Sequence, residues 1–210
     1  MKSKTTLVGW LTGSVVLLAA GTTSADPHTH DGFFFRGEVG VAYVSSSGTL
    51  KDNGSSTNMT VKGTGAGLGF FFGGTPAPGV VVGGALLGSD AVSPTVTMND
   101  RTGTADNSAL VLVLVGPFLQ YYPFPSEGLN LGLAVGFATL SAQNKDGNTE
   151  GQDNGFGASL SIGQDFWVGK EWSLGIAGRF SYARVSATTG AFTETANALF
   201  LMALFTFTYH

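Results

Sequence analysis

Large apolar side chains alternate with small ones along much of the chain. From Leu129 to Phe137 the odd positions carry Leu, Val or Phe, whereas the even positions carry Asn, Gly or Ala. Successive side chains of a β-strand point to opposite faces, so a period of two predicts a strand with one greasy face and one nearly bare face. The same alternation recurs over 33–43, 156–166, 172–182 and 199–209.

Breaks between these segments come in two kinds. Short Pro- or Gly-containing turns are predicted at 73–78, 123–128 and 169–171, and longer polar loops at 45–59, 90–107, 142–155 and 186–196. Three short turns alternating with four long loops predict eight antiparallel strands, and this asymmetry is typical of barrels in the bacterial outer membrane. Two of the strands, 79–89 and 108–122, are apolar on both faces and alternate poorly.

The small face decides between two fold classes. A soluble barrel turns its large apolar side chains inward and needs charges outside, whereas a membrane barrel turns them toward lipid. Here the second face offers mainly Gly, Ala and Ser. We therefore predict an all-β, eight-stranded antiparallel up-and-down transmembrane β-barrel, with a secreted soluble ligand-binding barrel as the less favoured alternative.

The N-terminus has the pattern of an export signal. Lys2 and Lys4 precede an apolar stretch from Leu7 to Ala20, and small residues at Thr23-Ser24-Ala25 suit a signal peptidase. The stretch is shorter than the roughly 20 residues of a membrane-spanning helix, which disfavours an uncleaved anchor. We expect a signal peptide over 1–25, a short flexible segment over 26–32, and the barrel domain over 33–210.

Composition supports strands in a membrane and excludes a nucleic-acid partner. Charged residues make up only 11% of the chain, which has 32 glycines and no cysteine. Removal of residues 1–25 leaves 8 basic against 14 acidic residues, a formal charge of -6. An acidic chain offers no basic surface for nucleic acid.

Aromatic residues gather at the chain end and beside the predicted turns. Phe205, Phe207 and Tyr209 alternate toward the C-terminus, which is similar to the closing strand that the barrel assembly machinery recognises; His210 departs from that pattern. Aromatic rings at the membrane interface form girdles. The predicted girdle residues are Phe72, Tyr121, Tyr122, Trp167 and Trp172.

Three stretches resemble a known family: DGFFFRGEVGVAYVSSSG (31–48), VGPFLQYYPFP (115–125) and NGFGASLSIGQDFWVGKEWSLGIAGRFSYA (154–183). They are similar to outer-membrane β-barrel-domain proteins and, more distantly, to the small eight-stranded outer-membrane barrels. The resemblance spans 31–210 and implies a fold and an outer-membrane location. It brings no catalytic residues.

Charged residues on the small face are the candidate site. They are Arg36, Glu38, Lys62, Asp165 and Arg179. An eight-stranded barrel has an interior just wide enough for side chains to fill, so buried charges of both signs should pair. We predict a carboxylate–guanidinium pair across the lumen, with Glu38 and Arg179 as the partners; the alternative is a narrow pore in which such pairs rearrange.

Other chemistry has weaker support. The three histidines, His28, His30 and His210, lie at the chain ends, which disfavours a lipid-modifying hydrolase or acyltransferase. A disordered N-terminus explains His28 and His30 as well as weak metal binding does, and the acidic stretch 146–153 lacks the ligand spacing of an EF-hand. The run 63–67 lacks the Lys-Ser/Thr of a phosphate loop. No enzyme activity, metal or cofactor is predicted.

The sequence thus favours a non-enzymatic outer-membrane barrel with a structural or surface-interaction role, acting through loops 90–107 and 142–155. A narrow passive channel or small-solute transporter is the alternative. The expected partners are outer-membrane lipid and the barrel assembly machinery, with no nucleic acid; the identity of an extracellular partner is unknown.

Overall fold

A computed structural model describes residues 32–52, 55–99, 101–124, 126–144, 146–189 and 192–210. They form nine strands: β1 (Gly32–Asp52), β2 (Ser55–Ala77), β3 (Val80–Met98), β4 (Arg101–Thr104), β5 (Ser108–Tyr121), β6 (Leu129–Asn144), β7 (Thr149–Trp167), β8 (Trp172–Thr189) and β9 (Phe192–Tyr209). None of these described residues forms a helix long and apolar enough to cross a membrane.

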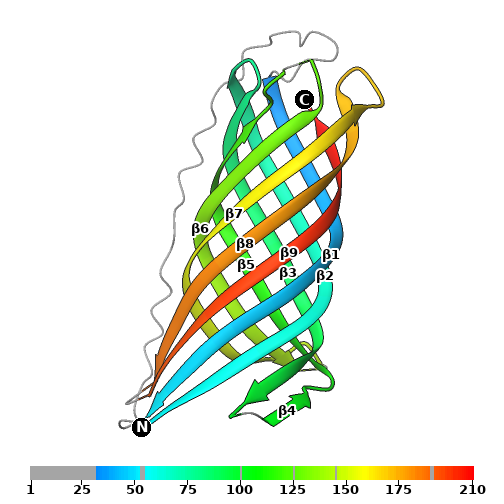
Figure 1. Cartoon of the computed structure of the whole chain (residues 1–210). Coiled ribbons are helices and arrows are strands. Elements are labelled where there is room, and N and C mark those ends of the chain that lie inside the picture. Colours follow the sequence, from blue (N-terminus) through cyan, green and yellow to red (C-terminus); the bar gives the residue numbers. More distant parts are fainter. Residues whose placement is uncertain (1–31, 53–54, 100, 125, 145, 190–191) are drawn as a thin grey trace, which may run out of the picture.

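Eight of the strands close into a barrel. Each pairs antiparallel with its neighbours in the order β2-β1-β9-β8-β7-β6-β5-β3, and β2–β3 pairing completes the ring. The short β4 pairs with β3 and projects with it at one end of the barrel (Figure 1). The predicted all-β, eight-stranded fold is confirmed.

The register fixes the tilt of the strands. Following directly paired residues once around the ring leads from Gly37 back to Ser47, ten residues further along β1. A sheet with this stagger closes only when its strands lean steeply against the barrel axis, by about 35–45°. Figure 1 shows this lean.

The two faces of the strands are those that the alternation predicts. Phe137, Phe156 and Phe205 point outward and are about 70% exposed, whereas Ala138 and Ala198 on the other face are almost fully buried. Large apolar residues cover the exterior on every barrel strand. Such a surface is stable against hydrocarbon but not against water, which removes the support for a soluble barrel.

The strands are longer than predicted. The stretches expected as long loops, 45–59, 90–107, 142–155 and 186–196, are mostly strand, and connections at that end are short. The Ser, Thr, Asn and Gly residues there lack an apolar face but still pair their backbones. Hairpins that continue beyond a membrane into water need no apolar outer face. The loss of alternation in the sequence therefore marks the edge of the apolar band and not the end of the strand.

Several predicted features lie outside the described residues. These are the signal peptide over 1–25 and the segment that holds His28 and His30; Gly32, expected at the end of that segment, already belongs to β1. The domain boundaries remain predictions.

One seam of the barrel carries an acidic side chain. Between β2 and β3 the pairing breaks between Thr64 and Gly67, and there the Ala66 N–H donates to the Asp90 carboxylate at 2.6 Å. Gly65 is required beside it, because a Cβ at that position would lie 2.1 Å from the Asp90 Oδ1 atom. The Asp90 carboxylate thus accepts the hydrogen bond that a backbone carbonyl of the neighbouring strand would otherwise accept.

We expect Asp90→Ala to lower the free energy of unfolding by about 1–3 kcal/mol, because the Ala66 N–H would lose its acceptor in a nonaqueous setting. Urea unfolding in lipid vesicles measures this change. The control is Asp106→Ala in the exposed turn before β5. Equal stability of both variants and the wild type would contradict the role of Asp90.

Candidate functional site: the charged layer in the lumen

Four charged side chains meet inside the barrel near the end where the β7–β8 turn lies. Arg36 and Glu38 are two residues apart on β1 and therefore share its inner face. Asp165 comes two residues before the end of β7, and Arg179 lies on β8. All four are at most 4% exposed.

The four groups form an alternating chain of charges. The Arg36 Nη1 atom lies 2.8 Å from the Asp165 Oδ2 atom, and its Nε atom lies 2.8 Å from the Glu38 Oε1 atom. Arg179 Nη2 contacts the other Glu38 oxygen. Two cations and two carboxylates sum to zero, so no net charge is buried, which is the condition under which buried ions are tolerated.

Asp165 is the centre of a wider hydrogen-bond network. Tyr122 and Asn130 donate to its Oδ2 atom at 3.0 and 3.1 Å, and Thr206 donates to its Oδ1 atom at 3.0 Å. Asn130 lies on β6, Thr206 on β9, and Tyr122 directly follows β5. The carboxylate of β7 therefore joins β1, β6, β9 and the residue that follows β5.

Arg179 is held by packing as well as by charge. Its guanidinium lies over the Phe71 ring, 5.1 Å from the centroid, a cation–π geometry. Gly69 leaves the space for this contact, because a Cβ there would lie 3.0 Å from both Arg179 and Glu38. An interior hollow beside Arg179 has a volume of about 10 Å³, room for about one water molecule.

Apolar and aromatic layers lie on both sides of the charges. Further along β1 the interior is filled by a cluster that includes Ala42, Val44, Phe200 and Met202. At the other side the His210 ring is buried against Phe34, Tyr122 and Trp167, with ring centroids 5.6, 5.8 and 4.9 Å away. The charged layer is thus enclosed along the barrel axis.

The assignment of Lys62 to the lumen is wrong. Lys62 is exposed on the outer face of β2, where even-numbered Leu68, Phe70 and Phe72 also point outward. The period of two places Lys62 with those residues. It lies past the apolar band, where its ammonium group can remain hydrated.

Two of the predicted girdle residues also face the other way. Tyr122 is fully buried, because its neighbour Tyr121 occupies the outward position, and Trp167 packs on the buried His210 instead of facing out. Phe72, Tyr121 and Trp172 do point outward, each about half exposed. Adjacent aromatics on a strand cannot both face lipid, and this signal was present in the sequence.

A second aromatic ring was missed. Tyr43, Phe137, Phe156 and Tyr182 are exposed further along their strands, and Phe137 packs on Phe156 with centroids 5.0 Å apart. Just beyond it the outer face turns polar, as in the hydrogen bond from Tyr182 to Asn197. Two aromatic rings bounding an apolar band are the pattern of a membrane-spanning barrel.

The residues proposed as a C-terminal assembly signal lie on the outer face of β9. Phe205 is highly exposed, and the Phe207 ring lies against Gly37 of β1, where any Cβ would collide with it. Gly37 pairs directly with Phe207 across the β1–β9 closure. Recognition of Phe205, Phe207 and Tyr209 by the assembly machinery remains a prediction.

The described ranges contain neither a metal cluster nor a phosphate loop at 63–67. No group of three or more His, Cys, Asp or Glu there is arranged to hold a metal ion. The run 63–67 lies within β2 and pairs with β1, so its glycines serve close strand packing.

The fold matches that of a solved membrane protein over the whole length of that protein. The outer membrane protein OprG from Pseudomonas aeruginosa superposes with a TM-score of 0.55 and 16% identity, covering 88% of this chain and 100% of that one. The chain has the fold of a small outer-membrane β-barrel. At this identity the likeness concerns the fold alone.

Two further structures align with lower scores. They are Neisserial surface protein A (TM-score 0.45, 10% identity, 83% of this chain and 96% of that one) and the outer membrane protein AlkL in lipid bilayers (TM-score 0.45, 14% identity, 90% and 94%). No family model matches the sequence. No curated protein matches it either.

Proposed function

We propose that the chain is a non-enzymatic barrel of the bacterial outer membrane with a structural or surface-interaction role. The observation that carries this is the filled lumen: the neutral Arg36–Glu38–Asp165–Arg179 layer lies between an apolar cluster and the His210 cap. A solute would have to break buried ion pairs to pass.

The ends of the hairpins are the parts available for contact with other molecules. The polar strand extensions lie beyond the aromatic ring of Tyr43, Phe137, Phe156 and Tyr182, and the β3–β4 pair projects at the same end of the barrel, the lower end in Figure 1. A rigid scaffold with polar segments at one end suits surface interaction.

Planar-bilayer recording tests this function against a passive channel. The purified barrel is expected to give no stable conductance steps, because the charges in the lumen are mutually neutralised and enclosed. Arg36→Ala with Glu38→Ala, which removes both the cation and the carboxylate at the centre of the layer, serves as the comparison in which the charged layer alone is weakened. Stable steps from the wild-type protein would overturn the proposal in favour of the channel.

A further inference from the structure

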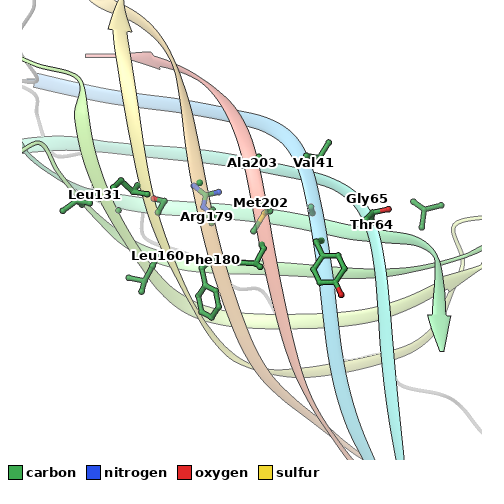
Figure 2. A pocket seen from close by; sticks show the side chains of 17 residues that line it. Val41, Thr64, Gly65, Leu131, Leu160, Arg179, Phe180, Met202 and Ala203 are labelled. Atoms are coloured by element: carbon green, nitrogen blue, oxygen red, sulfur yellow. The ribbon is translucent and has the colours of Figure 1, made fainter. Parts of the chain in front are cut away.

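A shallow apolar groove crosses the outer face of the barrel at right angles to the strands. Figure 2 shows that its labelled lining residues come from successive strands, from Leu131 on β6 to Gly65 on β2. The floor is formed by small residues, because Gly178 of β8 pairs directly with Ala203 of β9. Around Gly178 a Cβ would meet nothing within 4 Å.

Larger side chains wall the groove on both sides. Phe180, Leu201 and Tyr43 are register neighbours on one side, and Ile176 with Phe205 lie on the other. Since the strands lean, a groove perpendicular to them climbs from one membrane interface toward the other. In the row between these walls, Gly178 and Ala203 leave a gap two strands wide, and their direct partners Ile162 and Val41 bound it at either end.

Two cations lie at the margin of the apolar band that is nearer the β1–β2 and β3–β4 hairpin ends. Toward the hairpin end of β2, Lys62 is two residues from Thr64, which lines one end of the groove. Toward the hairpin end of β8, Arg184 is two residues from Tyr182. Both are exposed and on the outer face. Within the described part of the chain neither takes part in an ion pair.

Nearby polar groups leave these cations available. The Asp90 carboxylate already accepts the Ala66 N–H, and Tyr182 donates to Asn197. An anion at the level of Lys62 and Arg184 would therefore meet these two cations and the neutral Tyr182–Asn197 pair, while the Asp90 carboxylate lies beside Ala66, four residues from Lys62 along β2. The strands β9 and β1 separate the two cations, which suits a headgroup that carries more than one phosphate.

We propose that this face binds a multiply phosphorylated glycolipid of the outer leaflet, with one acyl chain over Gly178 and Ala203 and its phosphates at Lys62 and Arg184. The inference rests on the membrane location in the proposed function. The apolar lining suits a hydrocarbon chain, and the cations at its margin favour a negative headgroup. Each cation is expected to contribute about fivefold in affinity, the equivalent of about 1 kcal/mol near a membrane surface.

Lipid retention in native mass spectrometry tests the site. The full barrel is taken from phosphatidylcholine nanodiscs and exposed to diphosphorylated lipid A, phosphatidylglycerol or phosphatidylcholine. Lipid A should bind at least tenfold more tightly than phosphatidylcholine. The Lys62→Gln/Arg184→Gln variant should lose about 25-fold in affinity for lipid A, and Gly178→Leu, which fills the groove, at least fivefold.

Matched controls separate this site from general lipid attraction. Gly84→Leu fills an equally open outward position on β3, and Arg101→Gln removes an exposed cation on β4; both should bind lipid A as the wild type does. Equal losses in the controls, or phosphatidylglycerol binding as tightly as lipid A, would overturn the proposal. Failure of the wild type to enter nanodiscs would overturn the membrane location itself. Circular dichroism confirms that each variant is folded, and the double charge variant alters only exposed side chains.

Discussion

Replacing Arg36 with Met is expected to lower the free energy of unfolding by about 3–5 kcal/mol, the usual cost of leaving buried carboxylates without their cation. Arg36 bonds to both Glu38 and Asp165, so one substitution removes two of the three ion pairs in the layer. Arg179→Met should cost less, because Glu38 would retain Arg36. Urea unfolding in lipid vesicles gives the ranking.

The control for this series is Lys62→Met, which removes an exposed cation and should change stability by no more than about 0.5 kcal/mol. A double-mutant cycle with Glu38→Gln and Arg179→Met isolates their coupling, and replacing both should cost less than Arg179→Met alone. Coupling indistinguishable from zero, or an Arg36→Met variant as stable as Lys62→Met, would contradict the ion-pair layer.

Arginine on the outer face is the second large effect that we expect. Leu133 and Leu160 are direct partners on β6 and β7, and both point outward within the apolar band. Either Leu→Arg substitution should destabilise the barrel in lipid by about 2–4 kcal/mol, the range for arginine near the midplane. Folding yield and unfolding free energy in vesicles measure it.

Arginine at Thr95 or Asn148 provides the comparison, since both positions are exposed at the far ends of hairpins. These variants should fold like the wild type. If all four arginine variants fold equally well in lipid, the large apolar face does not contact hydrocarbon.

Most of the fold could be predicted because alternation is a local property. The period of two along Leu129–Phe137 already separates the face that meets lipid from the face that fills the lumen. The Glu38–Arg179 contact also followed, since two inward charges of opposite sign on strands near the closure have few other partners in so narrow an interior.

The rest depends on information that is not local. The network around Asp165 draws on Tyr122, Asn130 and Thr206, whose proximity follows from the stagger of the closed sheet. Strand length could not be inferred either. Ser- and Thr-rich hairpins in water lose the alternation of apolar side chains but keep the backbone hydrogen bonds between their strands. Lys62 and Tyr122 were misplaced for a simpler reason. The prediction assigned their face of the strand from residue type and not from the alternation of odd and even positions.

The charged layer also distinguishes the native pairing of β1 with β9 from its neighbours. A slip of one residue would turn Arg36 and Glu38 into hydrocarbon and Phe35 into the lumen. A slip of two would preserve the faces but displace Glu38 from Arg179 by about 7 Å, two strand residues. Burial of apolar side chains disfavours only register shifts by an odd number of residues, whereas the salt bridges also disfavour even shifts. These four side chains therefore help to fix the register between β1 and β9 where the barrel closes.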